Sequence, residues 1–146
     1  MISLPIKITV KSLATFLTLH LLLSSCQSAN ELKSEQYFAE GYQLYTTNCA
    51  NCHQNEGEGM ANLYPPLKGS AALTDKALLA CIIKNGMKDT IVVAGKKFSR
   101  PMPANPKLTD LEIAEIVTYL SMKWYTDSTL TPIEEVSKAL KECKVN

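Results

Sequence analysis

Apolar side chains recur at helical spacing in four stretches of the chain. The first runs from Ser34 to Cys49, where aromatic residues and a glycine fall three and four positions apart. The other three span residues 74–85, 109–124 and 131–143. A period of three to four residues is typical of a helix that buries one face. The pattern therefore predicts a small all-α domain.

Residues at the ends of these stretches predict where the helices begin and stop. Ser34 and Thr74 are predicted N-caps, and residues 109–112 and 131–134 fit the capping box. Gly86 is expected to end the second helix. The positions expected to face inward are Phe38, Gly41, Tyr42 and Tyr45; Leu78, Leu79, Ile82 and Ile83; Ile113, Ile116, Val117, Leu120 and Trp124; and Ile133, Val136, Leu140 and Cys143.

The segments between the predicted helices break the helical period. Residues 54–70 are rich in glycine and proline, so an irregular loop is expected there. Residues 90–94 are β-branched enough for a short strand, which could form a hairpin with Lys97 and Phe98. Prolines on both sides of Met102 keep that residue on an extended loop, because proline fixes φ and disfavours helix in the residue before it.

Residues 1–25 are predicted to be an export leader. Two lysines precede the apolar run Leu13–Leu23, which is shorter than the roughly 20 residues needed to span a bilayer. The run ends in Leu23-Ser24-Ser25-Cys26, which resembles the lipobox of bacterial lipoproteins. That resemblance implies cleavage before Cys26 and lipidation of its thiol, with residues 27–33 as a polar tether. An ordinary signal peptide with an incidental cysteine is the alternative.

Composition excludes few classes of protein but favours an ordinary globular domain. The 146 residues are 46% hydrophobic and 20% charged, which leaves room for one domain and an extension. The formal net charge is +1 at pH 7. Nucleic-acid-binding domains usually carry a strongly basic patch, so no nucleic-acid partner is expected.

One motif, Cys49-Ala50-Asn51-Cys52-His53, carries recognisable chemistry. C-x-x-C-H is the attachment pattern of c-type haem. Cysteines three apart on a helical turn share a face, so both thiols can bond the vinyl groups of one porphyrin. The following histidine can bind iron through a neutral ring nitrogen. We therefore predict one covalently bound haem c, with Cys49 and Cys52 as attachment sites and His53 as an axial ligand.

Two other interpretations of the motif need further features. A thioredoxin-like dithiol would lie beside a strand in a βαβ unit, and a zinc site would have further Cys or His ligands at short spacing. Neither context is present in the sequence, where His53 is the only histidine outside the leader. Ligation by two histidines of one mature chain is excluded for the same reason.

With these pieces the chain resembles a class I mono-haem cytochrome c over about residues 34–125. Gly41 and Tyr45 match the glycine and aromatic residue at which the first helix of the family crosses its last. Ile116 and Tyr119 match the residues that receive this crossing. The resemblance implies a cytochrome c-like fold with helices packed around one haem. It gives no role to the leader, the tether or the extra C-terminal helix.

The resemblance also implies roles around the haem. Pro65 matches the proline whose carbonyl accepts a hydrogen bond from the ligand histidine, and Leu67 matches a leucine that packs on the haem. Met102, in its Met-Pro-Ala setting, matches the second axial ligand. Spacing alone leaves three further candidates for that ligand, Met60, Met87 and Met122.

Two cysteines remain once the others have these roles. In an exported, oxidising compartment, a disulfide between Cys81 and Cys143 is expected, and it would hold the terminal helix in place. Two buried free thiols are the alternative, since disulfide geometry between helices is demanding.

The sequence therefore predicts a membrane-anchored c-type cytochrome, an electron carrier and not an enzyme. It would pass single electrons between redox partner proteins through a His/Met-ligated haem, facing the periplasm or the cell exterior. Its predicted parts are the leader 1–25, lipidated Cys26 with the tether 26–33, a cytochrome c domain 34–125 and a helical extension 126–146. Two alternatives stay open: a relay subunit of a larger dehydrogenase or oxidase complex, and a haem sensor or peroxidase with an open distal site.

Overall fold

A computed structural model describes residues 28–143. The predicted leader, Cys26 and Gln27 lie outside the described residues. The chain divides into two compact units, residues 1–32 and 33–146, and the architecture below is that of the second. Of the first unit, the structure describes residues 28–32. Within residues 28–143 no helix has both the length and the apolar character needed to cross a bilayer.

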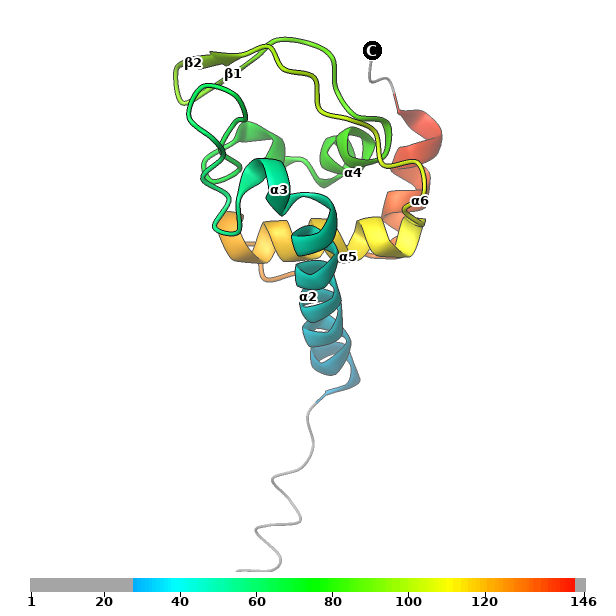
Figure 1. The fold of residues 1–146 in the computed structure, drawn as a ribbon. Coiled ribbons are helices and arrows are strands. Elements are labelled where there is room, and N and C mark those ends of the chain that lie inside the picture. The colour runs from blue at the N-terminus through cyan, green and yellow to red at the C-terminus, as the bar shows by residue number, and fades with distance from the viewer. Residues whose placement is uncertain (1–27, 144–146) are drawn as a thin grey trace, which may run out of the picture. The chain divides into compact units, whose positions relative to one another are not determined.

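The fold is helical, as predicted (Figure 1). Its helices are α2 (Ala29–Asn48), α3 (Ala50–His53), α4 (Lys76–Asn85), α5 (Asp110–Leu120) and α6 (Ile133–Glu142). A 3-10 turn, η1 (Ala71–Thr74), precedes α4, and a π-helical turn, η2 (Ser121–Tyr125), extends α5. One antiparallel hairpin pairs β1 (Ile91–Val93) with β2 (Lys96–Phe98), which confirms the predicted hairpin.

Helix α2 begins earlier than the sequence pattern predicts. Its first residue is Ala29, and the Oγ of Ser28 accepts a hydrogen bond from the backbone N–H of Glu31 at 3.2 Å. Ser34 lies inside the helix, so its predicted role as N-cap is wrong. Glutamate, leucine and lysine favour helix even without an apolar stripe, so the expected tether is helical from Ala29 onward.

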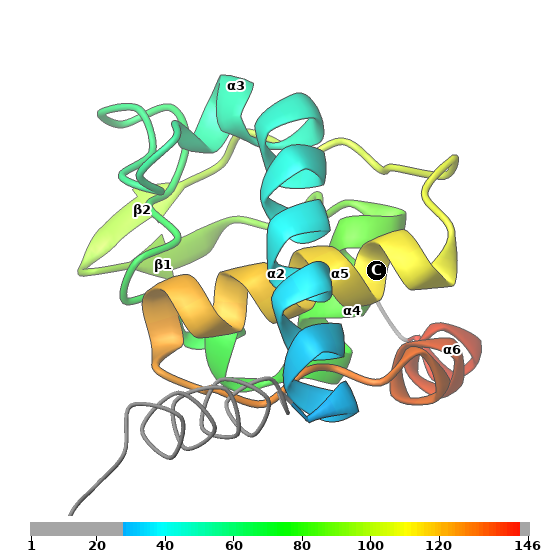
Figure 2. The ribbon, with the colours of Figure 1, turned by 90° about the horizontal axis from the view of Figure 1, so that it is seen from below.

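Helices α2 and α5 cross at Gly41, as predicted (Figures 1 and 2). A Cβ at Gly41 would lie 2.1 Å from the carbonyl oxygen of Glu115 and 2.8 Å from Cβ of Tyr119, so only glycine permits this approach. One turn further along α2, the ring of Tyr45 packs against that of Tyr119 with centroids 5.4 Å apart. The buried positions of α2 are Tyr37, Gly41 and Tyr45, whereas Tyr42, predicted to face inward, is 45% exposed.

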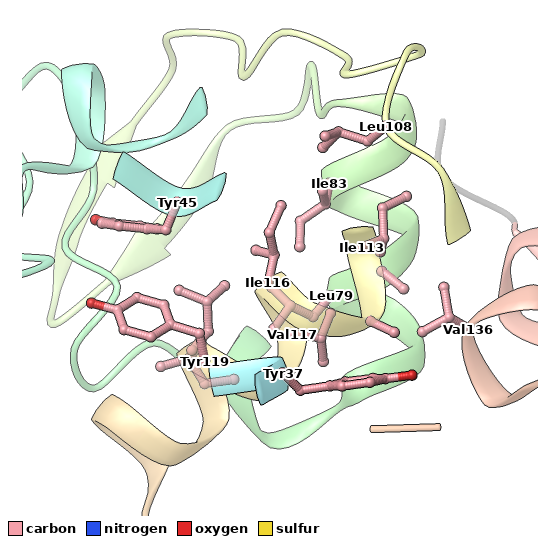
Figure 3. Close-up of a cluster of buried hydrophobic side chains, with 14 residues drawn as sticks. Tyr37, Tyr45, Leu79, Ile83, Leu108, Ile113, Ile116, Val117, Tyr119 and Val136 are labelled. Carbon is pink, nitrogen blue, oxygen red and sulfur yellow. The ribbon is translucent and has the colours of Figure 1, made fainter. Parts of the chain in front are cut away.

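The core lies where α5 meets its neighbours (Figure 3). Ile113, Ile116 and Val117 of α5 are fully buried against side chains of α2, α4 and α6. Full burial of such a side chain is worth about 1.5–3 kcal/mol. The predicted capping box is present: Thr109 Oγ1 accepts from the N–H of Glu112, whose carboxylate accepts from the N–H of Thr109. This capped helix is the element against which the others are placed.

The starts of α4 and α6 differ from the prediction. Asp75, and not Thr74, caps α4, because its carboxylate accepts the N–H of Leu78 at 2.9 Å. The expected capping box at Thr131 is absent. Thr131 is fully buried, its N–H donates to Thr118 Oγ1 at 2.9 Å, and Pro132 takes the N-cap position without a side-chain bond. Burial beside α5 therefore replaces capping at this threonine.

Helix α6 is held against α4 by packing and by a covalent bond. Val136 and Ala139 are its buried residues. Cys81 of α4 and Cys143 after α6 form a disulfide, with Cα atoms 5.7 Å apart. The structure therefore contains the expected pair and not two free thiols.

Candidate functional site

An apolar pocket lies between α2, α3, α4, the hairpin and the loops that join them. It encloses about 1070 Å³ of space between atoms, including the part that opens to solvent. The apolar residues of its wall are Pro65, Pro66, Leu67, Ala72, Leu79, Ile82, Ile83, Ile91, Phe98, Pro101, Pro103 and Leu120. A wall of this composition suits a mostly hydrophobic group.

The two cysteines and the histidine of the C-x-x-C-H motif, Cys49, Cys52 and His53, all line this pocket. The N–H of Cys49 donates to the carbonyl of Tyr45 at 2.8 Å, so the turn of α3 continues directly from α2. The N–H of His53 then donates to the carbonyl of Cys49 at 3.0 Å. Both cysteines are free thiols and are partly buried. One helical turn thus presents two thiols and an imidazole to the same space.

The imidazole of His53 has one ring nitrogen already engaged. Nδ1 lies 3.1 Å from the carbonyl oxygen of Pro65, which can only accept, so Nδ1 carries the proton. His53 is buried, and this burial lowers its pKa against the opposing effect of the Pro65 hydrogen bond. The ring is therefore neutral at pH 7, and Nε2 remains as the lone-pair nitrogen for a metal.

The surroundings of the thiols argue against the two other interpretations of the motif. Burial, followed by the proximity of Cys52, raises the pKa of Cys49 to about 12. A redox-active C-x-x-C cysteine instead needs a lowered pKa. Within residues 28–143 no cluster of three or more His, Cys, Asp or Glu side chains could hold a metal ion such as zinc.

Two of the four candidate methionines line the pocket. Met102 lines it, and so does Met87. The two residues pair as an isolated antiparallel bridge, with reciprocal N–H to O=C bonds of 3.0 Å and 2.8 Å. Met60 and Met122, the other candidates, are not among the residues that line the pocket. The pairing with Met87 depends on the turn after α4, so no local sequence signal could have shown it.

The sequence pattern did not predict that an arginine lines the pocket. Arg100, the only arginine of the chain, donates from Nη1 to the hydroxyl of Tyr64 at 2.9 Å and stacks on that ring at 5.2 Å. Both residues line the pocket. The sequence shows that Arg100 is the one arginine and that it precedes Pro101, but it gives no indication that this side chain lies at the pocket.

Comparison with known proteins decides the family. Residues 38–124 match the sequence model of the cytochrome c family. The chain belongs to the cytochrome c family. Cytochrome c-552 of Thermus thermophilus is 31% identical over 91 residues, which cover 59% of this chain and 69% of that protein. The cytochrome c subunit of a quinone alcohol dehydrogenase from Gluconobacter oxydans is 31% identical over 87 residues, which cover 58% of this chain but 18% of that subunit.

Cytochromes c are electron carriers with a covalently attached haem c, whose porphyrin holds the iron. This family therefore confirms the predicted function class and the predicted cofactor. The residues of the pocket fit this group. Two thiols three residues apart supply the covalent attachment points of a c-type haem, and a neutral buried imidazole and two thioethers supply the types of axial ligand that it uses. The apolar wall supplies the dry surroundings that tune such a group.

Proposed function

We propose that this cytochrome c carries single electrons through one haem that is bonded to Cys49 and Cys52 and ligated by His53 and Met102. The observation that carries the proposal is the hydrogen bond of 3.1 Å between His53 Nδ1 and the Pro65 carbonyl. It fixes the tautomer that leaves Nε2 for iron, inside a pocket that Met102 also lines. A bond of this kind makes the imidazole a stronger donor.

The bound haem supplies the one-electron couple Fe(III)/Fe(II), and the protein residues set its surroundings. The thiols of Cys49 and Cys52 would bond the haem covalently, so the group would stay with the protein in both redox states. Leu67 packs against the core and lines the pocket, where it would cover part of the porphyrin and exclude water. A neutral thioether such as that of Met102 favours Fe(II) and places the potential in the upper part of the range open to haem proteins.

We further propose that the domain works outside the cytoplasm on a lipid anchor. The support is the leader 1–25 and the lipobox-like sequence that ends in Cys26. Because acyl chains add about 0.8 kcal/mol for each buried CH₂ group, two or three chains hold a small domain on a membrane. The cytochrome c domain would then span residues 34–125, followed by the extension 126–146, and the domain would face the periplasm or the cell exterior.

A second candidate is a relay subunit of a larger oxidoreductase complex. The similarity to the cytochrome c subunit of a quinone alcohol dehydrogenase favours it. In that case the donor and acceptor proteins are fixed neighbours and not diffusing partners. Purification of the protein from its native membrane, with identification of the proteins that remain bound, separates a free carrier from a subunit.

The axial ligation is tested with Met102→Ala. The variant should keep covalent haem and His53 ligation, lose the weak red absorption band of a Met–iron bond, show a lower potential and bind carbon monoxide when reduced. Met102→His should also lower the potential but keep six ligands and stay closed to carbon monoxide. Met60→Ala is the matched control, because Met60 is 39% exposed and does not line the pocket.

Retention of the Met–iron band in Met102→Ala would contradict the assignment of Met102. Rapid carbon monoxide binding by the reduced wild-type protein would contradict it too, because it would show an open distal site. That second result would instead favour the sensor or peroxidase alternative.

A further inference from the structure

We propose that the end of helix α4, residues 83–87, is the element that positions Met102, with Gly86 and Asn105 as its positioning residues. We call residues 83–87 the α4 end. This inference rests on the proposed ligation by Met102. In this proposal, the end of a helix outside the C-x-x-C-H motif holds the Met102 sulfur where it can bind the iron.

The first support is the bridge between Met87 and Met102. The N–H of Met102 donates to the Met87 carbonyl at 2.8 Å, and the N–H of Met87 donates to the Met102 carbonyl at 3.0 Å. Residues that exchange both bonds across an antiparallel pair project their side chains to the same side. Both methionines accordingly line the haem pocket.

The second support is the space at Gly86. This residue ends α4 with φ +73°, a conformation that favours glycine. A Cβ there would lie 2.5 Å from the Met102 carbonyl oxygen and 2.7 Å from the backbone nitrogen of Ala104. The loop that carries Met102 therefore rests directly on the backbone of the α4 end.

Asn105 ties the same loop to the last carbonyls of α4. Its backbone N–H donates to Lys84 O at 3.1 Å, and its side-chain Nδ2 donates to Ile83 O at 3.0 Å. These carbonyls have no partner within the helix, since the last turn of any helix leaves its C=O groups free. Lys84 Nζ adds bonds to the carbonyls of Pro106 at 3.1 Å and Leu108 at 2.6 Å.

The Met102 loop needs this external support. Pro101 and Pro103 have no N–H, so between them only Met102 can donate from the backbone, and that bond goes to Met87. A thioether is also a weak ligand that cannot by itself order a displaced loop. The position of the sulfur therefore depends on the bonds to the α4 end.

The test is Gly86→Ala with Gly95→Ala as its matched control. Gly95 lies in the hairpin turn with φ +76°, so alanine causes similar backbone strain there, but its Cβ would meet nothing within 4 Å. A second variant, Asn105→Asp, keeps the side-chain size but replaces the donor to Ile83 with a negatively charged oxygen that the Ile83 carbonyl repels. All three are prepared as the haem-loaded full chain, and their melting temperatures are measured alongside the spectra.

Gly86→Ala should weaken or lose the Met–iron band while covalent haem remains. Its reduced form should bind carbon monoxide about tenfold faster or more, which corresponds to about 1.4 kcal/mol of lost ligand positioning. Asn105→Asp should shift the same readouts in the same direction, and Gly95→Ala should leave them at wild-type values. A purely structural role would lower the melting temperature of Gly86→Ala without separating its spectra from those of Gly95→Ala.

The proposal is overturned if Gly86→Ala matches Gly95→Ala in its band and carbon monoxide rate. If Gly86→Ala gives no folded protein, Asn105→Asp decides, and wild-type behaviour of that variant overturns the proposal. Absence of the Met–iron band from the wild-type protein would contradict the proposed ligation by Met102 itself, and not only its positioning by the α4 end.

Discussion

A missing Cβ at Gly41 sets the distance between α2 and α5. The helix backbones meet there so closely that any side chain would overlap the carbonyl group of Glu115. We predict that Gly41→Val forces the helices apart and lowers the free energy of unfolding of the haem-loaded protein by about 1–3 kcal/mol. Urea denaturation followed by tryptophan fluorescence measures this change.

Ala39→Val is the matched control for that prediction. Ala39 lies in the same helix but is exposed, so valine there changes helix propensity without touching α5. A loss of stability in Ala39→Val as large as in Gly41→Val would show that propensity, and not the crossing, is responsible.

Residues whose role is local could be predicted from the sequence, and residues whose role depends on a distant partner could not. The thiols and imidazole of the C-x-x-C-H motif occupy one helical turn, and the structure brings all three to one pocket. Pro65 and Met102 were expected there from the resemblance to cytochromes c, and both line it. The contributions of Met87 and Asn105 arise from the packing of α4 against the loop 102–108, which no short pattern records.

At the scale of elements, helix existence followed from apolar periodicity, but only some helix ends could be predicted. The capping box at Thr109 and the stop at Gly86 are observed, whereas the predicted starts of α2, α4 and α6 are not. Ser28 caps α2 six residues before the predicted Ser34, and Asp75 caps α4 one residue after the predicted Thr74. Thr131 was expected to cap α6 but is buried instead, where its N–H donates to the hydroxyl of Thr118. This contact with α5 could not be read from the local sequence.

The segment between η2 and α6 is joined to α4 by an ion pair with a predictable dependence on pH. Lys76 Nζ lies 2.8 Å from Asp127 Oδ2, and Oδ1 accepts bonds from the N–H of Thr129 at 2.9 Å and its hydroxyl at 2.6 Å. These contacts, the Lys76 bond foremost, lower the pKa of Asp127 from 3.8 to about 2. The carboxylate therefore stabilises the folded state above pH 3.8, and this contribution is lost as the pH falls towards 2.

We predict that Asp127→Asn destabilises the protein at pH 7 by about 1 kcal/mol, a value reduced for the partial exposure of the pair. The difference in unfolding free energy between variant and wild type should shrink as the pH falls from 4 to 2. Denaturation series at several pH values measure it, with exposed Glu142→Gln as control. A difference that stays constant with pH would show that the ion pair is not its source.

At the scale of the whole molecule, the pocket is assembled from segments that lie far apart in the chain. Its wall combines α2, α3, the loop 64–72, α4, the hairpin and the segment 98–105. The sequence predicted its contents, because a covalent haem motif implies a group large enough to need such a wall. It did not predict the wall's geometry, which depends on contacts between distant segments such as the pairing of Met87 with Met102 and the bonds from Asn105 to the end of α4.

The central claim is a one-electron carrier with covalent haem and two protein ligands on the iron. A spectroelectrochemical titration of the purified full chain, under carbon monoxide and under inert gas, tests it most directly. The account predicts one reversible one-electron transition, low-spin six-coordinate spectra in both redox states, the Met–iron band when oxidised and the same potential under both gases. A high-spin reduced spectrum, or a potential that rises under carbon monoxide, would contradict the account.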